Sequence, residues 1–269
     1  MKTISLPVSS TAAAVAIALF SLAGSAAAHD LVLVPQTSGD LTVKFGHPND
    51  WQPADKERLL ELKAEGPSGP SASLAPTLVG KGLELEAARV AAPGAAMLVS
   101  ARYDNGLWVT LPGPAGKDVY FNSTRAMVPG AKSTMAAIKF AKGMYATADD
   151  AALYKREVHH LIELIPQQNP ASVGIGGMLP VLVKFAGKPL AKAGVEITDA
   201  TTLSAEGQQK FMTDAAGIAQ VPIRTAGLNV VSVDYDRKND GSLGAAMKAL
   251  PVDKIAMIAT YSFMVAGKP

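Results

Sequence analysis

The feature that most constrains the fold is a series of short apolar segments, separated by glycine, proline and aspartate, that runs from Pro170 to the end of the chain. The segments with the length and composition of β-strands are residues 179–187, 193–200, 207–215, 218–224, 227–236 and 255–265. Short strands at such intervals favour an antiparallel β-sandwich. The succession of "GKPLAKAGVEI" and "TDAAGIAQVPI" is typical of an immunoglobulin-like or prealbumin-like module.

The preceding part of the chain also predicts a β-rich domain. Residues 31–45 have the pattern of two strands around the turn "TSGD", and further strands are predicted at residues 83–90, 95–104, 107–113 and 158–165. The alanine-rich segment Ala131–Tyr145 follows a Ser/Thr start and is predicted as a helix, and residues 147–158 as a helical turn or a loop. The expected fold class is therefore mainly β, with two β-sandwich-like domains and a short helical segment in the first.

The first 28 residues have the pattern of an export signal. Lys2 precedes an apolar run from Ala12 to Ala23, and the small-residue stretch "GSAAA" follows. A transmembrane helix needs about 20 apolar residues, so the run predicts a removed leader and not a membrane anchor. We therefore expect a signal peptide at residues 1–28, domains at residues 29–168 and 169–269, and a periplasmic protein that does not span the membrane.

The charge balance argues against one class of function, and the lack of cysteine excludes disulfide bonds. The chain has 25 Lys and Arg against 23 Asp and Glu, a formal net charge of +2, which argues against the clustered basic surface of a nucleic-acid-binding protein. It has no cysteine, so no disulfide can stabilise it in an oxidising compartment. Apolar cores must therefore hold the domains together.

Four histidines, all before the predicted domain boundary, are the candidate metal ligands, and His29 lies at the leader cut. Cleavage after Ala28 would make His29 the first residue, so that its α-amine and imidazole could chelate one ion. Cleavage after Ala26 would make it the third, and the amine, two amides and the imidazole would form the square-planar site that Cu(II) and Ni(II) prefer. In both cases Asp30 offers a neighbouring carboxylate.

The other histidines follow or lie within predicted strands. His47 follows a strand end in "FGHPNDW", where Asp50 could orient its imidazole by a hydrogen bond or cap the turn. His159 and His160 lie in the strand predicted at residues 158–165, so they face opposite sides and only one can join a given site. The alternation of side chains does not show which of the two would be the metal ligand.

The chain resembles the periplasmic domain-of-unknown-function family 4198, whose members are linked with nickel or cobalt uptake. The resemblance is carried by "AHDLVLVP", "VKFGHPND", "DKERLLEL", "ARYDNGLWVTL", "NSTRAMVPGAKSTMAAIKFAKGMY", "HHLIELIPQQNP", "GKPLAKAGVEI", "TDAAGIAQVPI" and "IATYSFMV". It implies an extracytoplasmic protein with a β-rich first domain and a sandwich-like second, which handles a transition metal through His29, His47 and His160. Where relatives have histidine, this chain has Tyr235 and Lys254, so a second site is expected to be weakened or missing.

The first hypothesis for function is a periplasmic protein that binds Ni, Co, Cu or Zn and assists its uptake or delivery. It is not an enzyme, and its expected partner besides the ion is an inner- or outer-membrane metal transporter. Imidazole nitrogens bind all of these metals. The expected ligands are His29, His47 and His160, with Asp30, Asp50 and His159 as supporting residues.

Two other classes of function are compatible with the same observations. A copper redox enzyme with a histidine brace would use His29 and one further histidine, but it needs a flat aromatic substrate face, and aromatic residues make up only 6% of the chain. A structural β-sandwich module for adhesion, assembly or carbohydrate contact would carry its histidines incidentally. Such a module would show no tight site when titrated with transition metals.

Overall fold

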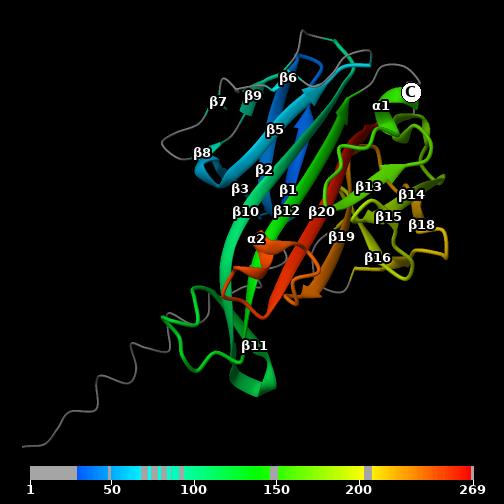
Figure 1. Ribbon diagram of the computed structural model, residues 1–269. Helices are drawn as coiled ribbons and strands as arrows, with labels where there is room; N and C mark the ends of the chain where they lie inside the picture. Colours follow the sequence, from blue (N-terminus) through cyan, green and yellow to red (C-terminus); the bar gives the residue numbers. More distant parts are fainter. Residues whose placement is uncertain are drawn as a thin grey trace, which may run out of the picture.

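The computed structural model describes residues 29–47, 50–67, 72–73, 78–79, 84–85, 87–90, 94–145, 151–202 and 208–267. Within these ranges the chain is mainly β, and most of its strands join three larger sheets (Figure 1). The fold class predicted from the sequence is confirmed in this respect. The predicted signal peptide, residues 1–28, lies outside the described residues.

The central sheet has nine strands. Their order is β17 (Phe211–Met212), β16 (Gly194–Thr198), β19 (Gly227–Lys238), β20 (Lys254–Val265), β12 (Ser133–Tyr145), β10 (Met97–Pro112), β5 (Leu59–Glu65) and β6 (Ala72–Ser73), with β11 (Asp118–Asn122) paired to β10. All neighbours in this sheet are antiparallel except β12 and β20, which run parallel over residues 135–144 and 254–263.

Two smaller sheets complete the stack. The β1 sheet has the order β1 (Asp30–Pro35), β2 (Asp40–His47), β9 (Ala87–Arg89) and β7 (Leu78–Val79), with β3 (Asp50–Gln52) paired to β2. The β14 sheet has the order β13 (Ile162–Pro166), β14 (Met178–Phe185) and β15 (Lys188–Pro189), with β18 (Ile218–Pro222) paired to β14. The remaining elements are the pair β4 (Ala54–Asp55) and β8 (Glu84–Leu85), the helices α1 (Ala151–Tyr154) and α2 (Ala245–Lys248), and 3₁₀ turns at Lys56–Arg58, Pro114–Gly116 and Pro170–Ser172.

The helix predicted at Ala131–Tyr145 is wrong, because this segment forms β12. The strand pairs with β10 on one side and β20 on the other, and almost all of its residues are buried. A strand covered on both faces is a nearly continuous apolar run, which periodicity alone does not distinguish from a buried helix. On a helix Lys139 and Lys142 would share one side, whereas on this strand they leave opposite faces of the sheet.

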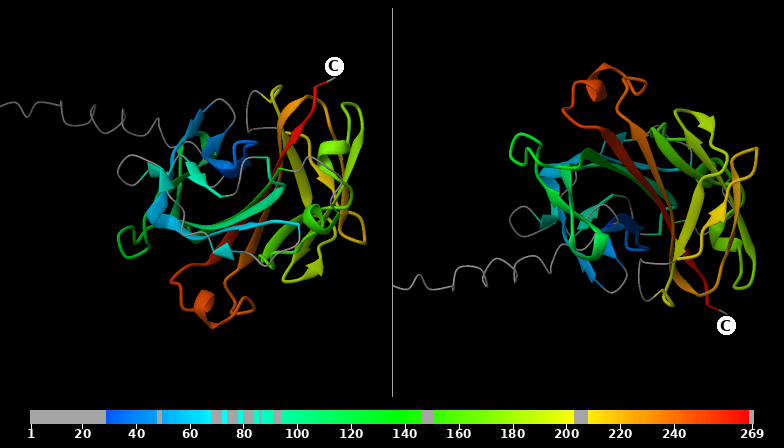
Figure 2. Two further views of the ribbon diagram at one scale, coloured as in Figure 1. Left: turned by 90° about the horizontal axis from the view of Figure 1, so that it is seen from above. Right: turned by 90° about the horizontal axis from the view of Figure 1, so that it is seen from below.

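We name the two faces of the central sheet after consecutive residues of β12, the Lys139 face and the Phe140 face. The β1 sheet packs on the Lys139 face, where Leu31 and Leu33 join a core with Met97 and Val99 of β10. The β14 sheet packs on the Phe140 face and buries the larger core. Figure 2 shows the layers end-on, with the central sheet between the two smaller ones. The molecule thus contains two sandwiches that share one sheet.

Strand β1 meets the central sheet with its edge, and side chains of that sheet cap its free carbonyl groups. Lys139 donates to the carbonyl oxygen of His29, Thr260 donates to Leu31 and Ser262 donates to Leu33. Gly143 lies below Leu33, and a β-carbon at this position would overlap the Leu33 carbonyl oxygen. An open strand edge carries backbone groups without hydrogen-bond partners. These contacts give the carbonyl groups at the edge of β1 their donors without a further strand.

The predicted domain boundary at residues 168 and 169 falls just after β13. Strands from both sides of it join in the central sheet, since β12 pairs with β20. The two sandwiches are therefore linked through backbone hydrogen bonds, and the division into two domains stays a prediction. In the part of the chain that the structure describes, no helix is long and apolar enough to cross a bilayer.

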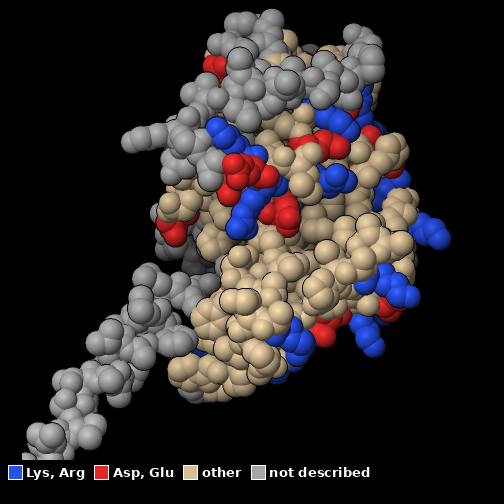
Figure 3. All heavy atoms as spheres, turned by 60° about the vertical axis from the view of Figure 1, so that its left-hand side comes forward, with Lys and Arg blue, Asp and Glu red and all other residues tan. Residues whose placement is uncertain are grey.

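Charged side chains are intermixed on the surface that Figure 3 presents. Basic and acidic groups lie next to one another there, without a broad patch of one sign. Elsewhere in the described chain, opposite charges also lie close together, as in the ion pairs of Arg58 with Asp55 and of Lys63 with Glu61. The described part of this surface therefore shows no continuous basic stripe for a polyanion.

Candidate functional site

His29 lies at the amino-terminal end of β1 and is held from two sides. Its ring stacks on the ring of Phe45, with centroids 5.4 Å apart and planes 7° apart. Its carbonyl oxygen accepts the hydrogen bond from Lys139, whose ammonium nitrogen also lies 5.7 Å from the centroid of Phe45. The half-buried His29 therefore has a defined place at the start of the strand.

The pairing of β1 with β2 brings His47 next to His29. The antiparallel register pairs Asp30 with Gly46, so His29 and His47 occupy the next position on each strand. Directly opposed residues in such a ladder have Cα atoms about 5 Å apart. The backbone therefore brings two of the three predicted histidine ligands to one end of the β1 sheet.

Asp50 lies beside His47 because β3 turns back against β2. The ladder pairs Asp50 with His47, and the Asp50 carboxylate accepts a hydrogen bond of 2.8 Å from Gln52. Gly46 has a φ of +129°, and a β-carbon there would overlap the backbone oxygen of Asp50. Glycine at position 46 thus permits the close return of β3.

Asp30 leaves β1 on the side opposite to His29, because side chains alternate along a strand. Burial raises the pKa of Asp30 to about 7, while the positive charge of Lys139 acts to lower it. Burial likewise lowers the pKa of Lys139 to about 8, opposed by the charge of Asp30. Asp30 therefore balances Lys139 inside the protein and does not face the His29 ring.

The structure does not bring His160 to this end of the β1 sheet. The ring of His160 packs on Phe140, with centroids 5.2 Å apart, whereas His29 lies against Lys139. Lys139 and Phe140 are consecutive in a central strand, so the sheet lies between the two histidines. The predicted set of His29, His47 and His160 is therefore not assembled around one point.

The strand predicted at residues 158–165 begins only at Ile162, so the reasoning that placed His159 and His160 on opposite faces of a strand is wrong. His159 is exposed and has a φ of 59°, in the left-handed region that non-glycine residues rarely adopt. His160 follows it into the interior and is only 7% exposed. The two neighbours thus differ in burial through a local turn of the backbone.

The described side chains form no group of three or more His, Cys, Asp or Glu that could hold a metal ion. The side chain of His47 lies outside this description. A metal site on the β1 sheet would therefore have to combine His29 with His47 and with a further group, such as the α-amine that export would create.

His160 is a neutral imidazole in the folded protein. Burial lowers its pKa to about 3, and the positive charges of Lys142, Arg102 and Lys63 act in the same direction. Its Nε2 atom has no hydrogen-bond partner among the described residues. A buried polar atom without a partner costs stability, so an imidazole kept in this place needs an explanation.

The pH dependence of unfolding should report this buried imidazole. The unfolded chain takes up a proton below about pH 6.5, whereas the folded protein keeps His160 neutral down to about pH 3, so stability is lost as the pH falls. We expect this residue to contribute a loss of about 1 kcal/mol between about pH 6 and about pH 5. Urea unfolding of His160→Gln should lack this part of the slope, while His159→Gln, at an exposed position, should keep it. Equal slopes in the two variants would contradict the assignment.

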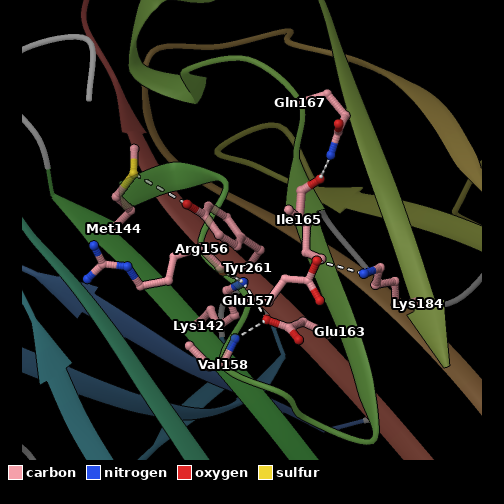
Figure 4. A network of polar contacts seen from close by, with 10 residues as sticks. All are labelled: Lys142, Met144, Arg156, Glu157, Val158, Glu163, Ile165, Gln167, Lys184 and Tyr261. Atoms are coloured by element: carbon pink, nitrogen blue, oxygen red, sulfur yellow. Dashed lines mark hydrogen bonds and ion pairs between the residues drawn. The ribbon is translucent and has the colours of Figure 1, made fainter. Parts of the chain in front are cut away.

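The sequence did not reveal a buried ion pair behind the Phe140 face. Lys142 and Glu163 form a salt bridge of 2.9 Å, and each side chain is 2% exposed. The Lys142 ammonium also donates to the carbonyl oxygen of Arg156 at 2.9 Å, and the backbone of Val158 donates to Glu163 at 2.7 Å (Figure 4). Burial lowers the pKa of Lys142, while Glu163 raises it. The pair therefore fixes the segment before β13 to the central sheet.

Comparison with known proteins gives a family but no activity. No curated protein matches the sequence. Among solved structures, the chain is similar to one described as "D0-D1 domain of Intimin", at 13% identity and a TM-score of 0.20, over 87% of this chain and 97% of that one. The family described as "Domain of unknown function (DUF4198)" matches residues 26–237, well over half of the sequence. This chain therefore belongs to the DUF4198 family.

Proposed function

We propose that this protein is a periplasmic carrier that binds a transition-metal ion at the amino-terminal end of β1 and assists its delivery to a membrane transporter. The observation that carries the proposal is the β1–β2 register, in which the pair Asp30 and Gly46 is followed by His29 and His47. Two imidazoles at neighbouring positions suit Ni, Co, Cu and Zn alike. His160 is not part of the proposed site, because the central sheet lies between it and His29.

The α-amine that export would create supplies the further nitrogen ligand. After cleavage behind Ala28, the amine and the imidazole of His29 chelate the ion together, and His47 adds the next nitrogen. After cleavage behind Ala26, backbone amides join the amine and the imidazole in a square-planar set. Asp50 pairs with His47 in the β2–β3 ladder, and we propose that its carboxylate orients that imidazole. The position of the leader cleavage thus determines which nitrogen ligands the site contains.

The test uses mature protein that starts at His29 and carries labelled imidazoles. Titration with Co(II), which is paramagnetic, should broaden the NMR signals of His29 and His47 first and leave those of His159 and His160 sharp. His47→Ala should weaken Co(II) binding at least about tenfold, because one of few ligands is lost. His159→Ala is the matched control and should bind as the parent protein does.

An amino-terminal extension separates the amine from the imidazole. Protein with a Gly-Ser-Gly-Ser-Gly extension before His29, which removes the free amine from reach of the imidazole, should bind Co(II) at least about tenfold more weakly if the amine is a ligand. Unchanged binding would remove the amine from the site. Broadening that begins at His160, or no binding by the mature protein, would overturn the proposal as a whole.

A further inference from the structure

A cavity of about 950 Å³ lies on the Phe140 face, away from the proposed metal site. It forms at the border where the β14 sheet stops covering the central sheet, so that β5 and β10 are left open. The turn with His159 and His160 lines one side, and Ala246 and Met247 of α2 line another. Figure 1 shows α2 beside the strands of the central sheet. The volume is at the upper end of the range for sites that bind small molecules.

The wall of this cavity that belongs to the central sheet includes the exposed side chain of Arg102. The ladders pair Arg102 of β10 with Glu61 of β5 and with Phe140 of β12, so these side chains leave the sheet on the same face. Glu61 is engaged in an ion pair of 3.0 Å with Lys63. Among the described residues, no acidic side chain forms an ion pair with Arg102. The charged side chains among the described residues that line the cavity are Arg102, Lys63 and Glu61, which together carry one net positive charge.

The lining of the cavity also includes apolar side chains and one buried imidazole. Ile138, Phe140 and Met247 supply hydrocarbon surface, and His160 lies among them with its unpartnered Nε2 atom. His159, at the same turn, holds a φ of 59°. Strained backbone and unsatisfied buried polar groups tend to gather at binding sites, where a ligand compensates for their cost.

We propose that this cavity binds a small organic anion, a monocarboxylate with an apolar body. Its carboxylate pairs with Arg102, and its hydrocarbon part lies on Phe140 and Met247. A polar atom of the ligand reaches the Nε2 atom of His160. Guanidinium groups bind carboxylates through parallel hydrogen bonds, so Arg102 selects a planar anion.

The test titrates the full mature protein with hexanoate and benzoate, and follows the labelled imidazoles by NMR. The chain contains four histidines, so each site has its own reporters in the same spectrum. We expect saturable shifts at His159 and His160 and none at His29 and His47. Hexan-1-ol, which has the apolar body without the charge, should bind at least about tenfold more weakly than hexanoate.

Arg102→Gln should weaken hexanoate binding about tenfold, because a charge-assisted hydrogen bond is lost. Arg224→Gln is the matched control, since Arg224 is exposed outside the cavity and should leave binding unchanged. Equal affinity for hexan-1-ol, equal affinity of the two variants, or no shift at His160 would overturn the proposal. Because the metal test reads His29 and His47 instead, failure of one proposal does not imply failure of the other.

Discussion

Replacing Lys142 with methionine is expected to lower the free energy of unfolding by about 3–5 kcal/mol. The substitution leaves Glu163 buried behind the central sheet without its positive partner, with the Val158 amide as its remaining donor. A charge that is buried and unpaired costs far more than the pair itself contributes. Chemical denaturation of Lys142→Met, followed by circular dichroism, measures this loss directly.

The double variant Lys142→Met, Glu163→Leu tests the cause. It removes both charges and replaces them with apolar groups, so it should recover most of the lost stability. Lys132→Met is the matched control, because Lys132 pairs with Asp118 at the exposed surface and its loss should change the free energy of unfolding little. If the double variant were as unstable as Lys142→Met, lost packing and not the unpaired charge would be the reason.

Gly143→Ala is expected to destabilise the protein by about 3 kcal/mol and to loosen β1. A methyl group at this position overlaps the carbonyl oxygen of Leu33, which is backbone and cannot move aside without shifting the strand. The shift would break the hydrogen bond from Ser262 to Leu33 and disturb the one from Thr260 to Leu31. Hydrogen exchange of the β1 amides should therefore become faster than in the parent protein.

Gly130→Ala is the control for this prediction. A β-carbon at Gly130 has no atom within 4 Å, and its φ is not in the left-handed region. It should therefore change stability little and leave hydrogen exchange in β1 as it was. Equal protection of β1 in Gly143→Ala and the parent protein would show that the edge of β1 does not depend on close contact with the central sheet.

The elements that the sequence predicted well have strong local signals. The hairpin of β1 and β2 has two apolar runs around a short polar turn, and it forms where predicted. The strands after Pro170 are bounded by glycine and proline, and the ends of β14, β16, β18, β19 and β20 agree with the predicted segments to within two residues. In these segments local composition and tertiary packing favour the same structure.

The predictions from the sequence are wrong where tertiary packing, and not local composition, determines the structure. The alanines and methionines of residues 131–145 favour a helix. In the folded protein this segment is a strand, and its small residues, such as Gly143, let β1 approach β12 closely. Lys139 and Lys142 then become buried residues on opposite faces, each with an acidic side chain from a distant element nearby. No spacing along the sequence links Lys142 to Glu163, so the pair could not be predicted.

The candidate site was predictable in part. The proximity of His29 and His47 follows from the hairpin, because a correct register fixes which residues are opposed. The position of His160 depends on the turn at His159 and on which side of the central sheet the chain passes. The packing of the β14 sheet determines on which side of the central sheet His160 lies. The residues around His160 give no sign of this packing.

The contacts of β1 also set the order in which this protein can finish folding. Thr260 and Ser262 cap carbonyl groups that lie 229 residues earlier in the chain. Strand β1 precedes β20 along the chain, so the first strand keeps an open edge until β20 has joined the central sheet. Closing so large a loop is slow, and the nascent chain is exposed to wrong pairings during that time. A chaperone that shields the amino-terminal strand during this interval would raise the yield of folded protein.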